Sequence, residues 1–411
     1  MPHLPRYNLF EVFGIELEYM IASRSDLSLM PLSPDLLRNT QGKVLNEIVR
    51  GELAISNELV MHVIELKNNY PCASLTNLDV IFHAEVVRLN KLLEVKNACL
   101  LPTGAHPFMN PLTDSLLWPY DNSPIYNLYN QIFDCRGHGW SNLQSMHLNL
   151  PFNGDEQFGR LHAAIRLVLP LIPAIAASTP MLDGALTGFA DSRMETYRLN
   201  QKAIPSITGL VIPEAVFTKK EYHATIFDPI VRDITPYDTH HVLDKHFLNS
   251  RGAIARFDRN AIEIRVIDTQ EAPVADIAIA QFIVVLLQHL VNEEFCSYQL
   301  QQTASTQMLY TILLSAIRES ENAILNNTDF LKLFGITQKQ IIVSDLISIL
   351  VDKVKVDLNE TTLKVMKVIE NQGTLSTRIT KALGNNFDHN RVVQVYTELA
   401  KCLKYNSMYC K

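Results

Sequence analysis

The sequence lacks the glycine-rich loops that identify many nucleotide-binding proteins. Neither a G-x-x-x-x-G-K-[ST] loop nor a G-x-G-x-x-G loop occurs in its 411 residues. This absence excludes the P-loop and dinucleotide-binding folds in their usual form. If the protein uses ATP, bound metal and cationic side chains must hold the triphosphate instead.

Cysteine and positive charge are also sparse. The six cysteines contain no C-x-x-C pair, which excludes a zinc ribbon and a thioredoxin-type site and favours reduced thiols in a cytoplasmic protein. The formal net charge is -7 and no block of Lys and Arg stands out, so we expect no nucleic-acid partner. An anionic substrate would need locally placed cations or metal.

Long apolar runs are missing as well. The N-terminal string MPHLPRYNLFEVFG is too polar for a signal peptide. Residues 167–182 and 277–291 are the most apolar segments, but both are shorter than the roughly 20 residues that span a bilayer. We therefore expect buried core segments and no membrane partner.

The chain divides by its pattern into a mixed part and a helical part. Hydrophobic residues make up 47% and charged residues 19%, as in a globular protein with a sizeable core. Proline is absent after Pro273, and the remaining pattern is helical. We predict a catalytic domain over 1–300 and a helical extension over 301–411 packed on it. Apolar periodicity predicts helices over 73–94, 158–177, 273–291, 304–326, 338–354, 359–371 and 388–404.

The segment FGIELEYM, residues 13–20, alternates with period 2 and places two acids on one face. Glu16 and Glu18 would lie roughly 7 Å apart and repel by about 2 kcal/mol at an effective dielectric of ~20. One interpretation is an exposed strand on which solvent dissipates the repulsion. The other is a bound divalent cation that reverses it.

Two further segments of the same kind carry acids. In LVMHVIELKN, residues 59–68, Glu65 follows an apolar run and requires either a salt bridge or a cation. In AIEIRVID, residues 261–268, Glu263 and Arg265 share a face. They form an ion pair, or Glu263 holds metal while Arg265 holds phosphate, which guanidinium matches well.

The segment LQSMHLNL, residues 143–150, has one apolar face and one polar face, and the polar face carries Ser145, His147 and Asn149. A single histidine in such a place is more often structural than a metal ligand. Together the four segments predict an antiparallel sheet with an apolar side under helices and an acid-rich side. Such carboxylates suit Mg²⁺, which also bridges nucleotide phosphates.

Three loops carry further polar residues. LPTGAHP, residues 101–107, contains Gly104 and His106. The segment 178–198 contains glycines that permit close backbone approach, together with Arg193 and Arg198, which either meet an anion or are solvated. The histidines of HHVLDKH, residues 240–246, lack zinc spacing and are predicted to be solvated.

These strings, in this order, resemble the second family of glutamate–cysteine ligases, which includes bacterial carboxylate–amine ligases. The strings that carry the resemblance across residues 10–290 are GIELEYM, VIEL, LPTGAHPFMNP, QSMHLNLPF, STPMLDGALTGFADSRMETYR and IEIRVIDTQEAP. The resemblance implies an α+β, glutamine-synthetase-like fold with a curved antiparallel sheet, helices outside and an active site on the concave face. It also implies that ATP phosphorylates the glutamate side chain and that the amine of cysteine displaces phosphate.

The resemblance also implies residue roles. Glu16, Glu18, Glu65, Glu263 and His147 match metal ligands for Mg²⁺ or Mn²⁺, with Asn149 beside His147. Arg265 matches a phosphate-binding arginine and Arg193 a substrate-facing cation, whereas Thr103 and His106 match a loop without an assigned role. The partners that the resemblance implies are the small-molecule substrates. The sequence does not decide whether the protein forms a homo-oligomer.

Three alternatives to a glutamate–cysteine ligase stay open. No residue pattern identifies the amine pocket, so the chain could be a ligase with a different amine acceptor. A guanidino kinase of related fold would stop at phosphoryl transfer. A non-catalytic nucleotide-binding or regulatory protein is the third, and the intact acidic and arginine positions argue against it.

Overall fold

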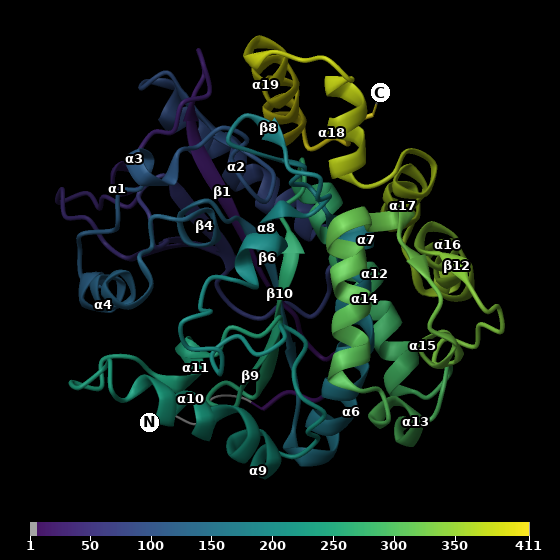
Figure 1. Cartoon of the computed structure of the whole chain (residues 1–411). Coiled ribbons are helices and arrows are strands. Elements are labelled where there is room, and N and C mark those ends of the chain that lie inside the picture. Colours follow the sequence, from purple (N-terminus) through teal and green to yellow (C-terminus); the bar gives the residue numbers. More distant parts are fainter. Residues whose placement is uncertain (1–5, 411) are drawn as a thin grey trace.

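The computed structural model describes residues 6–410. The first five residues of the N-terminal string discussed above lie outside the described residues. An open, fully antiparallel sheet forms the centre of the molecule, in the order β2-β3-β4-β1-β6-β10-β9, and β5 pairs with β1 beyond β6 (Figure 1). Its strands are β1 (Gly14–Ser23), β2 (Glu47–Arg50), β3 (Leu53–Asn57), β4 (Val63–Asn68), β5 (Ala98–Leu101), β6 (Ser145–Pro151), β9 (Ala253–Arg256) and β10 (Ala261–Asp268).

The alternation predicted from sequence is present in the sheet. On β1 the side chains of Ile15, Leu17 and Tyr19 are fully buried. They join one core cluster with apolar residues of the long helices, whereas the acidic side chains of β1 point to the opposite face. One face of the sheet therefore supplies packing energy and leaves the other for chemistry.

Helices surround this sheet, and short pairs β7–β8 and β11–β12 lie apart from it. The pairs are β7 (Met181–Leu182), β8 (Ala185–Leu186), β11 (Ile324–Leu325) and β12 (Ile341–Ile342). The helices of the first 300 residues are α1 (Ser33–Leu36), α2 (Leu78–Glu94), α3 (Pro111–Asp114), α4 (Ser123–Phe133), α5 (His138–Ser141), α6 (Gly154–Val168), η1 (Leu169–Leu171), α7 (Pro173–Ala176), α8 (Ser192–Tyr197), α9 (Lys219–Tyr222), η2 (His223–Phe227, a π-helix), α10 (Asp228–Ile234), α11 (Lys245–Leu248) and α12 (Pro273–Val291). Those that follow are α13 (Tyr298–Gln302), α14 (Thr306–Glu319), η3 (Ser320–Asn322), α15 (Thr328–Lys332), α16 (Val343–Val354), η4 (Lys355–Asp357), α17 (Glu360–Gln372), α18 (Leu375–Leu383) and α19 (His389–Tyr405).

Four helix predictions differ from the structure. Residues 304–326 form α14, η3 and strand β11, and residues 338–354 contain strand β12 before α16 begins at Val343. The other two predictions differ for local reasons. Helix α2 begins five residues later than expected, because Asn77 adopts a left-handed conformation with φ of 63°. The helix predicted over 158–177 is divided into α6, η1 and α7 around Pro170 and Pro173. Proline removes a backbone donor and clashes with the preceding turn, so a single straight helix could not form there.

Helix α12 matches its predicted range of 273–291. It is the one helix of residues 6–410 long and apolar enough by composition to cross a membrane, and 72% of its most apolar window is buried. It packs against α2, α6 and α17. Its uniform apolarity therefore reflects a central place in the protein core.

The C-terminal helices lie along one side and one end of the sheet (Figure 1). Residues of α14 to α17 belong to the same core cluster as the sheet. Near the chain end, buried Arg378 of α18 donates hydrogen bonds to Glu271, just after β10, and to the carbonyl of Tyr409 at 2.7 Å. The helical part thus packs closely on the first part, and the division at residue 300 stays a prediction.

Candidate active site

A cavity of about 530 Å³ opens on the polar face of the sheet. Its walls come from β1, β4, β6 and β10, together with α4, α5, α8 and the segment before β9. Its lining contains both acidic and basic side chains, which suits a polyanionic ligand accompanied by cations. The charged lining residues, histidines included, are Glu16, Glu18, Glu58, Glu65, Lys67, His147, Arg193, His246, Arg256, Arg259, Glu263 and Arg265.

Strand register brings the predicted residues together. Glu16 of β1 pairs across the sheet with His147 of β6, and Glu18 pairs with Glu65 of β4. Asn149 pairs in turn with Glu263 of β10. Directly opposed residues on antiparallel strands share a face, so four segments spread over 250 residues converge on one cavity wall.

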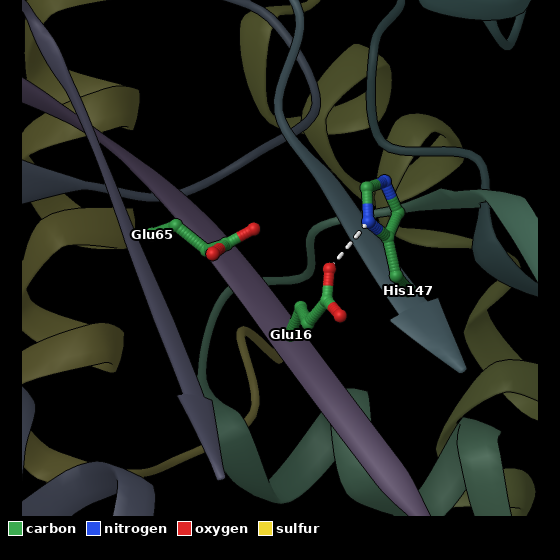
Figure 2. Close-up of side chains that lie close together, drawn as sticks. All are labelled: Glu16, Glu65 and His147. Atoms are coloured by element: carbon green, nitrogen blue, oxygen red, sulfur yellow. Dashed lines mark hydrogen bonds and ion pairs between the residues drawn. The ribbon is translucent and has the colours of Figure 1, made fainter. Parts of the chain in front are cut away.

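The Glu16 carboxylate and the His147 imidazole form the centre of this wall (Figure 2). His147 donates from Nδ1 to Glu16 at 2.9 Å, and the Asn149 amide donates to the other Glu16 oxygen at 3.1 Å. Burial disfavours the charged form of each group. The hydrogen bond and charge of the partner outweigh it, lowering the pKa of Glu16 to about 2 and raising that of His147 to about 9.

Glu18 lies at the other end of the same imidazole. It accepts hydrogen bonds from the backbone N–H of Ser145 at 2.7 Å and from the Ser145 hydroxyl at 3.2 Å. That hydroxyl lies 2.9 Å from Nε2 of His147. A Glu18 oxygen lies 3.8 Å from the same nitrogen, so the imidazole lies between the carboxylates of Glu16 and Glu18.

Glu65 and Glu58 add two more carboxylates beside β1. Glu65 accepts a hydrogen bond from the Ser56 hydroxyl at 2.5 Å and forms an ion pair with Lys67 at 3.0 Å. Burial and the negative charge of Glu16 nevertheless raise the pKa of Glu65 to about 7. Burial and the charge of Glu18 raise the pKa of Glu58 well above its ordinary range.

Two groups of these side chains have the spacing and chemistry of a divalent-cation site. One ligand atom each of Glu16, Glu65 and His147 lies within 4.8 Å of the others, and the same holds for Glu18, Glu58 and Glu65. Carboxylate oxygens are the ligands that hard cations prefer. A bound cation would offset both the burial and the charge of Glu16 that raise the pKa of Glu65, so the residues present fit such an ion.

Glu263 and Arg265 form the ion pair that one interpretation of the sequence predicted, with Nε 3.1 Å from the carboxylate. Glu263 also lies 3.8 Å from His147 and 3.7 Å from Arg256. Both residues line the cavity, so the ion pair belongs to the site rather than to an outer surface.

Arg193 lies in the cavity wall but is not a solvated loop residue. Its side chain is 1% exposed and forms an ion pair with buried Asp268 through Nε. The glycines of this segment do not serve close approach as expected. Gly184 and Gly188 have φ of 76° and 82° with open space around them. Gly184 lies in the exposed turn between β7 and β8, and Gly188 lies in the exposed segment that follows β8.

The residues of the 101–107 loop are structural. Thr103 is buried with φ of 83°, and buried His106 donates from Nε2 to the Leu27 carbonyl at 2.8 Å. Neither lines the cavity. Of the HHVLDKH histidines, His240 and His241 are exposed as predicted, whereas His246 lines the cavity and is bonded to Asp244 at 2.9 Å.

Sequence reasoning missed several lining residues. Glu58 lies in the connection between β3 and β4, outside any alternating pattern, so no local signal in the sequence identified it. Tyr126, Tyr129 and Trp140 form an aromatic wall from α4 and α5, where no helix was predicted. The Trp140 ring nitrogen is buried and has no hydrogen-bond partner within residues 6–410.

Comparison with known proteins agrees with this geometry. The model of glutamate-cysteine ligase family 2 matches residues 12–328. An uncharacterized protein of Archaeoglobus fulgidus is 31% identical over 97% of this chain and 100% of its own length. A Ralstonia pickettii protein, provisionally named glutamate–cysteine ligase 2, is 30% identical over 45% of this chain and 46% of its own length.

A solved structure shows the same fold. The glutamate–cysteine ligase of Francisella tularensis, crystallised with AMP, has a TM-score of 0.59 and 12% identity, covering 98% of this chain and 90% of that one. This likeness assigns the open antiparallel sheet to the glutamine-synthetase-like fold, and the family match assigns the protein to enzymes of the ligase type. The family match extends over most of the sequence, and the chain belongs to glutamate–cysteine ligase family 2.

Proposed function

We propose that this protein is an ATP- and magnesium-dependent ligase that joins the side-chain carboxylate of glutamate to the amine of cysteine. The observation that carries the proposal is the convergence of Glu16, Glu65 and His147 within 4.8 Å on the cavity wall. Buried carboxylates need cations or hydrogen-bond donors, and their oxygens are the ligands that hard divalent cations prefer. Family membership supplies the reaction type.

In this proposal Glu16, Glu18, Glu65, Glu263 and His147 hold Mg²⁺ or Mn²⁺, and Glu58 joins them. The metal, when bound, neutralises the transferring phosphoryl group and orients both substrates. His147 must give up a proton to become a ligand, and Glu16, 2.9 Å away, holds its ring in place. Asn149 fixes the Glu16 carboxylate from the other side.

Arg265 binds the phosphate that is transferred. Its guanidinium lies against Glu263 in the cavity and offers a planar set of donors that matches phosphate oxygens. Arg193 faces the carboxylate of the acidic substrate. Phosphorylation of the glutamate side chain gives an acyl phosphate, which the acceptor amine attacks with release of phosphate.

The acceptor is the least constrained part of the proposal. The aromatic wall of Tyr126, Tyr129 and Trp140 faces the same cavity and offers no group that selects a thiol. A ligase of this family that uses another amine is therefore the second candidate. Both work on small molecules in the cytoplasm.

A screen of amines with ATP, magnesium and glutamate, read by mass spectrometry, tests the proposal. We expect γ-glutamylcysteine together with ADP and phosphate. Efficient amide formation from another amine, with none from cysteine, would assign the second candidate. Phosphorylation of a guanidino compound without any amide would remove the protein from the ligases.

A further inference from the structure

We propose that Asp268 is a positioning residue that fixes the guanidinium of Arg193 for binding a substrate carboxylate. The inference rests on the proposed function, because it names the acidic substrate as the ligand of Arg193. Asp268 is the last residue of β10, three positions after Arg265, and does not itself line the cavity.

The two side chains form a buried ion pair. Nε of Arg193 donates to Oδ1 of Asp268, and the exposed fractions of the two side chains are 1% and 0%. A guanidinium held through Nε has one edge occupied, which leaves its two terminal nitrogens for other partners. Asp268 therefore sets the direction in which those nitrogens point.

The terminal nitrogens have almost no protein partners. Nη1 lies 3.5 Å from the carbonyl oxygen of Arg265, at the outer limit for a hydrogen bond, and Nη2 is buried without a partner within residues 6–410. Buried donors are normally paired. Because Arg193 belongs to the cavity wall, a carboxylate entering the cavity can supply the missing acceptor oxygens.

Asp268 is itself held rigidly. Its second oxygen accepts hydrogen bonds from the Ser178 backbone at 2.8 Å and from the Thr179 hydroxyl at 3.0 Å. Gly104 closes over the carboxylate, and a Cβ on that glycine would lie 2.7 Å from it. The Asp268 carboxylate cannot rotate without breaking these contacts, so it holds the guanidinium of Arg193 in one orientation.

The helix that carries Arg193 has a cap of its own. Asp191 caps the start of α8 by accepting from the backbone of Met194 at 2.8 Å. The Thr179 hydroxyl, which donates to Asp268, also accepts from the backbone N–H of Arg193 at 3.1 Å, so Asp191 holds α8 without Asp268 although the two anchors meet at Thr179. Loss of Asp268 should release the guanidinium while α8 keeps its place.

The experiment measures glutamate affinity by calorimetry, with magnesium and a non-hydrolysable ATP analogue present, in the parent, Asp268→Asn and Arg193→Lys. We expect glutamate affinity to fall roughly 10- to 100-fold in both variants, the range for hydrogen bonds to charged groups, while analogue affinity changes less than about twofold. Arg193→Lys keeps the charge beside Asp268, so it tests the terminal donors even if Asp268→Asn folds poorly.

Chemical rescue separates positioning from general damage. Low millimolar guanidinium should restore part of the glutamate affinity of Arg193→Ala, because Asp268 can seat the free ion, and should not restore it in Arg193→Ala with Asp268→Asn. Arg198→Lys, which alters a guanidinium paired with Glu195 one residue past α8, is the matched control and should behave as the parent.

Three results would overturn the inference: unchanged glutamate affinity in Asp268→Asn, rescue that does not need Asp268, or equal losses of glutamate and analogue affinity. Equal losses of glutamate and analogue affinity would mean that the ion pair of Arg193 with Asp268 stabilises β10 near Arg265 and does not position a substrate-binding group. A parent protein that binds no glutamate would contradict the proposed function, and with it the ligand named here. If the parent protein and a correctly folded Asp268→Asn variant bind glutamate with equal affinity, the result contradicts the inference but leaves the proposed function in place.

Discussion

Glu16 and His147 lie directly opposite each other on two antiparallel strands and are joined by a hydrogen bond of 2.9 Å. They are 131 residues apart in the sequence. This pairing places an imidazole between the carboxylates of β1 and those of β10, and it makes the acidic face one site.

Replacing Glu16 or Glu263 with Gln should lower turnover by orders of magnitude while the fold survives. Each substitution removes a hard anionic ligand and nearly preserves shape, so the loss should be largest when magnesium is limiting. Steady-state rates across a magnesium titration provide the measurement. Glu156→Gln, at an exposed position on α6, is the control, and full activity of both site variants at low magnesium would remove them from the metal site.

Arg265→Lys should impair turnover despite keeping the charge. Lysine lacks the planar pair of donors that matches phosphate, so we expect a loss of about 10-fold or more in kcat/KM for ATP. Arg160→Lys, at a surface pair with Glu293, controls for the substitution itself. A lysine variant equal to the parent in rate and nucleotide affinity would make Arg265 purely structural.

Glu58→Gln should stabilise the metal-free protein and weaken its response to magnesium. Burial and the charge of Glu18 raise the pKa of Glu58, so its ionisation opposes folding near neutral pH, and a side chain that does not ionise should remove a cost on the order of 1 kcal/mol. Glu58, Glu18 and Glu65 also offer oxygens within 4.8 Å of one another, so the same change removes a candidate metal ligand. Thermal unfolding with and without magnesium measures both effects. The parent should gain stability with magnesium as mass action requires, and an unchanged magnesium response in the variant would place Glu58 outside the metal site.

The buried histidines His62 and His106 should make the protein sensitive to acid. Burial lowers the pKa of each to about 4, below the value of 6.5 for the unfolded chain. Between these values the unfolded state binds more protons, so stability is present above pH 6.5 and is lost toward pH 4. The loss is at most about 1.4 kcal/mol per pH unit for each histidine.

His106→Gln provides the check, because Gln can still donate toward the Leu27 carbonyl but does not titrate. Urea unfolding at pH 7.5 and pH 5 should show a smaller loss in this variant than in the parent. An equal loss in both proteins would mean that His106 does not contribute to the acid response.

Much of the sheet was predictable because its signals are local. The alternation around Glu16, Glu65, His147 and Glu263 gave the strands and the face of each acid, and the register then followed from the fold. The salt bridge that one interpretation expected for Glu65 is formed with Lys67, and the ion pair of Glu263 with Arg265 is also present. They line the cavity, so pairing and ligand binding are not exclusive interpretations.

The remaining parts depend on tertiary contacts that no local pattern encodes. Asp268 reads as the end of a strand, and only the fold brings Arg193, 75 residues earlier, onto it. Glu58 lies in a turn, and Trp140 in a four-residue helix, where periodicity carries no signal. The roles of all these residues at the site stay predictions until they are measured.

The most direct test of the central claim is trapping of the activated carboxylate. Glutamate, ATP and magnesium are incubated with hydroxylamine in place of the amine substrate, and products are read by mass spectrometry. An acyl phosphate predicts γ-glutamyl hydroxamate and ADP in equal amounts, dependent on magnesium and lost in Glu263→Gln. Conversion of ATP to ADP in the presence of glutamate without any hydroxamate would contradict activation of the side-chain carboxylate.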